Sequence, residues 1–112
     1  MKIAFTTSGT TLSAPMDIRF GRAAKFLVYD TGNKDFIVID NEGVAAAQGA
    51  GIKAAETIVK AGAKVLVTGD CGPKAFHALK QADVKIHLSK AATVADSLEG
   101  YLAGELVEMT AA

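Results

Sequence analysis

The hydrophobic and polar positions along this chain predict five strands and three helices. The runs of strand type are residues 2–6, 26–30, 36–40, 65–67 and 84–88. The second and third runs have strong β propensity, and the residues between them have hairpin-turn chemistry. The fourth run is apolar throughout, which is typical of a strand buried on both faces. The last run alternates instead, with Lys85 and His87 on one face.

Three further segments carry apolar residues at the spacing of a helix. Gly62 follows the first segment as its C′ residue, and Pro73 opens the second with its φ already set for a helix start. Thr93 and Asp96 form a capping box at the start of the third, which Gly104 ends. The positions expected to face inward are Ile52, Ala55, Ile58 and Val59; Phe76, Leu79 and Ala82; and Val94, Leu98, Tyr101 and Leu102.

The order of these elements predicts one α/β domain spanning residues 1–112, with a five-stranded mixed sheet and three helices. The first three strands form a meander, and right-handed crossovers through helices lead to parallel strands. If the fourth strand lies beside the first, the order is 3-2-1-4-5 with strand 2 antiparallel. Residues 105–112 then form a tail. Four loops, residues 7–25, 41–51, 68–72 and 88–93, would emerge at the carboxyl edge, where open α/β sheets bind ligands.

The composition limits the classes of partner. Lys plus Arg and Asp plus Glu number 12 each among 112 residues, so no net field would attract nucleic acid or an anionic membrane. No apolar run approaches the roughly 20 residues of a membrane span. The single cysteine cannot form an internal disulfide, and no secretory segment follows Met1. We therefore expect a cytoplasmic monomer that binds neither nucleic acid nor membrane.

Basic residues gather at the ends of the four loops, although the chain as a whole is neutral. Arg19 and Arg22 flank Gly21, where a glycine would let the backbone approach a ligand. Guanidinium groups bind anions through several donors at once. With Lys53 and Lys74 they predict a basic pocket for an anion; the alternative is that the arginines are ordinary surface residues.

The turn at residues 69–72 delivers Cys71 to the N-terminus of a helix. Free backbone amides and the positive end of the helix dipole would meet a ligand there. A thiolate in that place would have a lowered pKa, which suits metal coordination or redox chemistry. The alternative is a small residue that fills a turn. Without a second cysteine dithiol exchange is excluded, and neither His77 nor His87 has the partner of a helical zinc site.

Several sequence blocks follow one another in a distinctive order. They are MKIAFTTS at residues 1–8, RFGRA at 19–23, GPKAF at 72–76, VKI at 84–86 and YL at 101–102. Together they resemble the dinitrogenase iron–molybdenum cofactor-binding family, over nearly the whole chain. The resemblance implies a ribonuclease-H-like mixed sheet and a carrier of the iron–molybdenum cofactor or its precursors. Many relatives have histidine where this chain has Arg19, which favours charge pairing over imidazole ligation here.

The leading hypothesis is a non-catalytic carrier of an anionic cluster. As a short stand-alone chain with Cys71, it is most similar to family members that hold a molybdenum–copper sulfide cluster. Protein partners in cofactor assembly or cell-division complexes are a further expectation. Alternatives are the iron–molybdenum cofactor or a precursor as cargo, a cysteine-dependent redox or transfer enzyme, and an adaptor in cofactor assembly. The candidate cofactor-binding residues are Ser8, Arg19, Gly21, Arg22, Lys53, Gly69, Asp70, Cys71, Gly72 and Lys74, with Cys71 also the candidate metal ligand.

Overall fold

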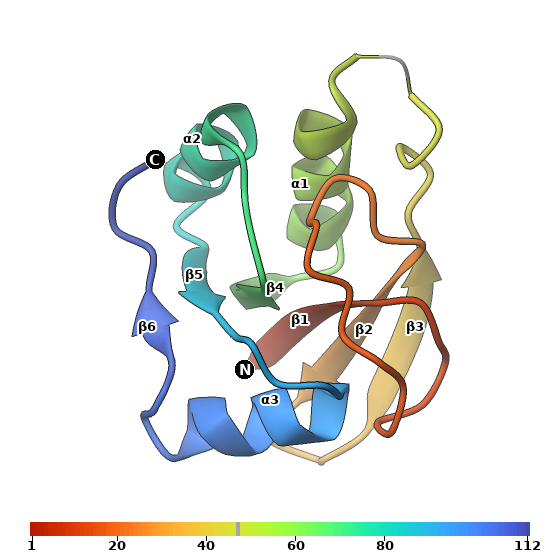
Figure 1. The fold of residues 1–112 in the computed structure, drawn as a ribbon, viewed down its shortest axis with the longest axis vertical. Coiled ribbons are helices and arrows are strands. Elements are labelled where there is room, and N and C mark those ends of the chain that lie inside the picture. The colour runs from red at the N-terminus through yellow and green to blue at the C-terminus, as the bar shows by residue number, and fades with distance from the viewer. Residues whose placement is uncertain (47) are drawn as a thin grey trace.

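A mixed sheet organises the fold (Figure 1). The computed structural model describes residues 1–46 and 48–112, and these residues form six strands and three helices. The strands are β1 (Lys2–Thr7), β2 (Lys25–Asp30), β3 (Phe36–Asp40), β4 (Ala63–Thr68), β5 (Lys85–Leu88) and β6 (Val107–Glu108). The helices are α1 (Ala50–Lys60), α2 (Pro73–Gln81) and α3 (Val94–Leu102).

The strand order is β3-β2-β1-β4-β5-β6, and it confirms the predicted arrangement of the first five strands. Strand β2 lies antiparallel between β1 and β3, whereas β1, β4 and β5 run parallel. The predicted count of five strands is wrong, because β6 pairs antiparallel with β5 inside the expected tail. Two residues are too short for alternation to reveal a strand. The ribonuclease-H-like class stays an expectation of the resemblance.

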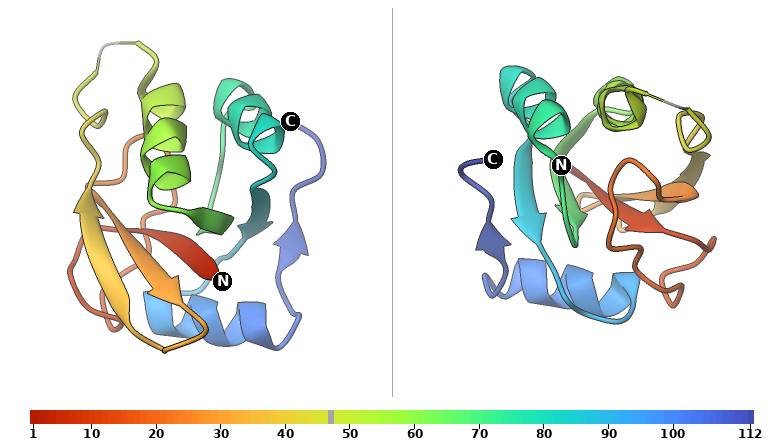
Figure 2. Two further views of the ribbon diagram at one scale, coloured as in Figure 1. Left: turned by 180° about the vertical axis from the view of Figure 1, so that it is seen from behind. Right: turned by 45° about the horizontal axis from the view of Figure 1, so that its top comes forward.

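Helices cover both faces of the sheet. Helices α1 and α2 lie side by side on one face and α3 lies on the other (Figures 1 and 2). Strand β4 shows the division, because Leu66 packs in the cluster beneath α1 and α2, while Val65 and Val67 pack in the cluster with α3. Ile3 and Phe5 likewise point to the α3 side and Ala4 to the other. These observations confirm a fourth strand that is buried on both faces.

The helix ends are as predicted, but three inward-facing positions are wrong. Gly62 and Gly104 have φ of 84° and 72°, and the Thr93 hydroxyl accepts a hydrogen bond from the Asp96 N–H at 3.2 Å. Ile52, Val59 and Leu102 are instead 39, 40 and 62 % exposed. Alanines take part of the buried face of α1, where Ala50 and Ala54 pack in place of larger side chains. Alanine contributes little to a hydrophobic pattern, so its burial is hard to predict from sequence, although its small size permits close packing.

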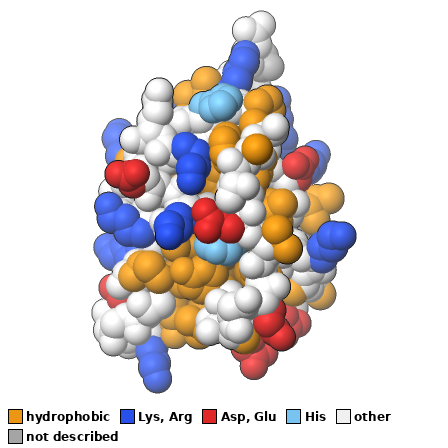
Figure 3. Space-filling model, turned by 90° about the vertical axis from the view of Figure 1, so that its left-hand side faces the viewer, with side chains coloured by type: hydrophobic (Ala, Val, Ile, Leu, Met, Phe, Trp, Pro, Cys, Tyr) orange, Lys and Arg blue, Asp and Glu red, His pale blue; other side chains and the backbone are white. Residues whose placement is uncertain are grey.

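The outer surface agrees with the balanced composition. On the face shown in Figure 3, positive and negative side chains are interspersed around apolar ones. None of the helices formed by the described residues has the length and apolar character needed to cross a membrane.

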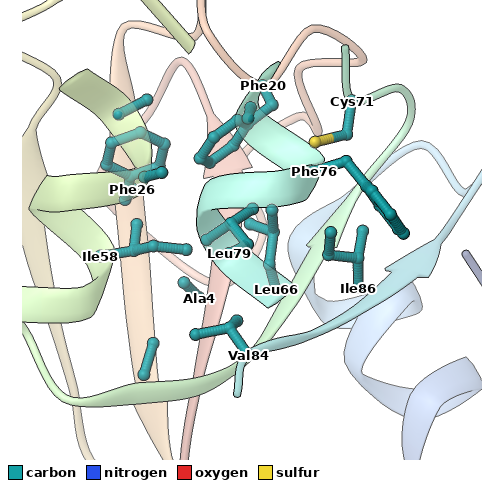
Figure 4. Packing of buried hydrophobic residues seen from close by; sticks show 14 of the residues in the cluster. Ala4, Phe20, Phe26, Ile58, Leu66, Cys71, Phe76, Leu79, Val84 and Ile86 are labelled. Carbon is teal, nitrogen blue, oxygen red and sulfur yellow. The ribbon is translucent and has the colours of Figure 1, made fainter. Parts of the chain in front are cut away.

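Phe20 anchors the long loop of residues 8–24 in the core. Its side chain is 2 % exposed, and its ring centroid lies 5.7 Å from that of Phe26 on β2. Figure 4 shows the two rings beside Ile58 of α1 and Leu79 of α2. The loop is therefore held from inside the fold by an aromatic side chain.

We expect Phe20→Ala to lower the free energy of unfolding by about 3 kcal/mol or more, because it leaves a cavity among packed side chains. Ile18→Ala is the matched control in the same loop, since Ile18 is 64 % exposed, and it should change stability by less than about 0.5 kcal/mol. Urea denaturation of both variants measures the difference. Equal losses would show that Phe20 is not the anchor of this loop.

Candidate functional site

The loop of residues 8–24 joins the other three loops at the carboxyl edge of the sheet. Its contacts are the Phe20 N–H to the Asp70 carbonyl (3.2 Å), the Met16 N–H to the Ala92 carbonyl (2.9 Å) and the Asn41 side-chain amide to the Ala23 carbonyl (2.8 Å). The first contact accompanies a parallel bridge between Arg19 and Asp70. The expected meeting of the four loops is thus confirmed.

Threonines at the end of β1 hold this loop against the sheet. Thr6 and Thr7 are fully buried, and their hydroxyls donate to the carbonyls of Asp17 at 2.6 Å and Pro15 at 2.7 Å. Thr68 of β4 shares a further hydrogen bond with Thr6 at 2.9 Å. These hydroxyls give the buried backbone groups of the loop their partners.

A hollow of about 460 Å³ lies between this loop and the first turns of α1 and α2. We call it the α1–α2 hollow, and it is lined by residues 20–22, 48–52 and 72–75. These lining residues include two cations, Arg22 and Lys74, and no carboxylate. Figure 1 shows that both helices begin at the same end of the molecule, beside the loop.

The first turns of α1 and α2 have no side-chain caps. Glycines stand at both N-caps, Gly49 for α1 and Gly72 for α2, and neither first turn contains an acidic residue. Among the described residues, no acceptor meets the N–H groups of the first turns, namely those of Ala50, Gly51, Ile52, Lys74 and Ala75. Such N–H groups carry the positive end of the helix dipole, which favours negative charge nearby.

Helix α3 begins at the same edge but is capped by the protein itself. The N–H groups of Val94 and Ala95 donate to the carbonyls of Ala14 at 3.0 Å and Leu12 at 2.8 Å. The Asp96 N–H donates to the Thr93 hydroxyl. Three helices therefore begin at this edge of the sheet. Among the described residues, hydrogen-bond acceptors meet the first-turn N–H groups of α3 but not those of α1 and α2.

Small residues bring the loop and both helix starts into close contact. A Cβ on Gly21 would lie 3.0 Å from the backbone nitrogen of Gly51. A Cβ on Gly51 would lie 3.1 Å from the Cβ of Ala75. In this structure the missing side chain of Gly21 makes room for α1. Gly51 and Ala75 were not singled out from the sequence, where nothing in the local pattern sets them apart from other small residues.

Nine of the ten predicted site residues fall into three groups, and Cys71 stands apart from them. Gly21, Arg22, Gly72 and Lys74 line the α1–α2 hollow. Ser8, Arg19, Gly69 and Asp70 belong to the surrounding loops: Ser8, Arg19 and Asp70 are exposed, and a Cβ on Gly69 would lie 2.7 Å from Ile18. Lys53 lines a separate hollow with Asp40, Glu42 and Glu56, and its Nζ lies 3.9 Å from a Glu56 carboxylate oxygen.

Cys71 is part of the core. Its side chain is 4 % exposed, and its sulfur points inward beside Phe76 (Figure 4). Burial, and after it the charge of Asp70, raises the pKa of the Cys71 thiol to about 11. The expected lowering of this pKa is wrong, because desolvation of the thiolate outweighs its place before the N-terminus of α2. At neutral pH Cys71 is therefore a thiol.

The histidines lie apart from the α1–α2 hollow. His77 is exposed on α2, whereas His87 is half-buried with its ring centroid 5.0 Å from that of Tyr101. Burial lowers the pKa of His87 against the opposing charge of Glu108. In the part of the chain that the structure describes, no three His, Cys, Asp or Glu residues form a group that could hold a metal ion.

Comparisons with known proteins identify relatives over nearly the full length. The family model described as dinitrogenase iron-molybdenum cofactor matches residues 1–104. The apo form of the orange protein of Desulfovibrio gigas is 38 % identical with a TM-score of 0.94, over 98 % of this chain and 93 % of that chain. A NifB-like protein of Thermotoga is 32 % identical with a TM-score of 0.88, over 99 % and 95 % of the two chains.

A more distant relative is an uncharacterized protein of Methanocaldococcus jannaschii, which is 27 % identical over 109 residues, or 95 % of this chain and 89 % of that protein. The resemblance seen in the sequence blocks is confirmed by the family match and by the two structures above 30 % identity. The chain belongs to the dinitrogenase iron-molybdenum cofactor family.

Proposed function

We propose that this protein is a non-catalytic carrier of an anionic molybdenum–sulfide cluster, with copper as the second metal, held in the α1–α2 hollow. The main support is that two helix N-termini without side-chain caps face the same hollow. Arg22 and Lys74 also line this hollow, and none of its lining residues is a carboxylate. Backbone amides and cations of this kind stabilise negative charge. Family membership and the similarity to the orange protein support a cluster as the ligand.

The chemistry of such a cluster suits this site. Its metals are already ligated by sulfide, so the protein need not supply a set of thiolates or imidazoles. The cluster needs positive charge, N–H donors and partial shelter from water, which strengthens electrostatic contacts. The α1–α2 hollow offers these through Lys74, Arg22 and the first turns of both helices. The iron–molybdenum cofactor or a precursor is the alternative cargo, by the family's description.

The other predicted residues receive supporting roles in this proposal. Arg19 adds positive charge from the neighbouring loop, while Gly69 and Asp70 shape the turn before α2. Cluster contacts by Lys53 and by the Cys71 sulfur are not part of this proposal, because Lys53 lines the other hollow and Cys71 is buried; both earlier expectations are tested below, and Ser8 stays a prediction. A cytoplasmic monomer with protein partners in cofactor assembly or cell-division complexes is likewise proposed.

Reconstitution with tetrathiomolybdate and copper(I), followed by desalting, tests the proposal. We expect a coloured complex whose retention falls as ionic strength rises, because salt screens the contacts that hold it. Combining Arg22→Ala with Lys74→Ala should reduce affinity about tenfold or more, since charge-assisted hydrogen bonds are lost.

Combining Lys53→Ala with Lys60→Ala is the matched control, because both lysines line the other hollow and the charge change is the same. It should leave affinity close to that of the wild type. Equal losses in the two double variants would contradict the α1–α2 hollow as the site. A wild-type protein that retains no colour would contradict the carrier function.

The reactivity of the buried Cys71 thiol distinguishes the carrier hypothesis from that of a cysteine-dependent enzyme. Because the pKa of Cys71 is raised to about 11, thiolate forms in the folded protein only as pH rises toward that value. Iodoacetamide should therefore react slowly between pH 7 and 9 and rapidly once urea unfolds the chain. Cys71→Ser should leave cluster retention close to that of the wild type. Rapid native alkylation, or loss of the cluster in a folded Cys71→Ser variant, would restore a direct role for the sulfur.

A further inference from the structure

Arg22 contacts two parts of the chain at once. It lines the α1–α2 hollow, and its Nη1 donates to the carbonyls of Val44 at 2.9 Å and Ala46 at 2.8 Å. Both hydrogens of Nη1 are thereby used. In the described part of the chain the donors on Nε and Nη2 have no acceptor. These remaining N–H groups form a planar donor pair, the geometry that matches two adjacent acceptor atoms of an anion.

We propose that Arg22 is a pre-oriented bidentate donor, which selects an anion with two neighbouring sulfur atoms on one tetrahedral metal centre. This inference rests on the proposed function and specifies how the cluster is recognised. The two loop carbonyls fix the plane of the guanidinium before the ligand arrives. A fixed donor loses less conformational entropy on binding than a mobile one.

Asn41 is the positioning residue for this arrangement. It is 2 % exposed, and its side-chain amide donates to the carbonyls of Gly21 at 3.2 Å and Ala23 at 2.8 Å, on either side of Arg22. Its Oδ1 accepts from the Gly43 N–H at 3.2 Å. The same side chain therefore holds the backbone of Arg22 and the start of the loop that carries its two acceptors.

Arg19 provides the contrast. Both arginines are exposed, but the Arg19 Nε lies 3.9 Å from an Asp17 carboxylate oxygen, beyond hydrogen-bond distance. In the described residues no carbonyl orients its guanidinium. Arg19 thus acts through its charge, which lysine also carries, whereas lysine lacks the planar donor pair that we assign to Arg22.

The test compares Arg22→Lys with Arg19→Lys, because both variants keep the net charge. Binding of tetrathiomolybdate with copper(I) is measured by titration. Arg22→Lys should lower affinity about tenfold or more, and Arg19→Lys should lower it less than about twofold. Wild-type affinity in Arg22→Lys overturns the inference and leaves the carrier function standing. A wild-type protein that binds nothing overturns the carrier function, and this inference falls with it.

Two further measurements test the positioning. In ligand-free protein, Arg22→Lys should speed amide hydrogen exchange in residues 43–46, because two hydrogen bonds to this loop are lost; unchanged exchange contradicts the orientation by carbonyls. Asn41→Ala should weaken binding several-fold in the wild-type background and less than about twofold beside Arg22→Ala. Additive losses contradict the role of Asn41. If Asn41→Ala does not fold, the comparison of the two lysine variants still decides the proposal.

Discussion

Two helix N-termini that point into one hollow are the constraint on which the rest of the site depends. Their first-turn N–H groups carry partial positive charge, and Lys74 and Arg22 add to it. Placing like charge together costs free energy unless an anion joins them. The fold brings the two turns together through small residues, because Gly51 packs against Ala75 with little room to spare. Both helices lie on the same face of the sheet and begin at its carboxyl edge, so their dipoles add at this point.

The three helix starts at this edge differ in whether the chain supplies acceptors to their N–H groups. At α3 the loop of residues 8–24 gives its own carbonyls to the helix, and the site there is closed. At α1 and α2 the chain places glycines, Gly49 and Gly72, where a serine or aspartate would supply a cap. Phe20 holds the loop between these regions from within the core. One loop therefore caps one helix and forms a wall of the hollow before the other two.

Sequence reasoning succeeded where the signal is local and failed where partners are distant. The apolar run at residues 65–67 predicted a strand buried on both faces, and the capping pair Thr93 and Asp96 predicted the start of α3. The state of Cys71 did not follow, because its pKa depends on packing by residues far along the chain. Lys53 lies on α1 but lines the other hollow and not the α1–α2 hollow. The positioning role of Asn41 was not predicted, because its side chain contacts Gly21 and Ala23, which lie about twenty residues away in the sequence.

The central claim is that an anion is held by the amides of two helix starts. The most direct measurement is a titration of ¹⁵N-labelled, ligand-free protein with tetrathiomolybdate and copper(I), followed through the backbone amide resonances. The account predicts the largest shifts at the first-turn amides of α1 and α2, with those at the capped start of α3 unchanged. Shifts centred on α3, or on the hollow beside Lys53, would contradict it.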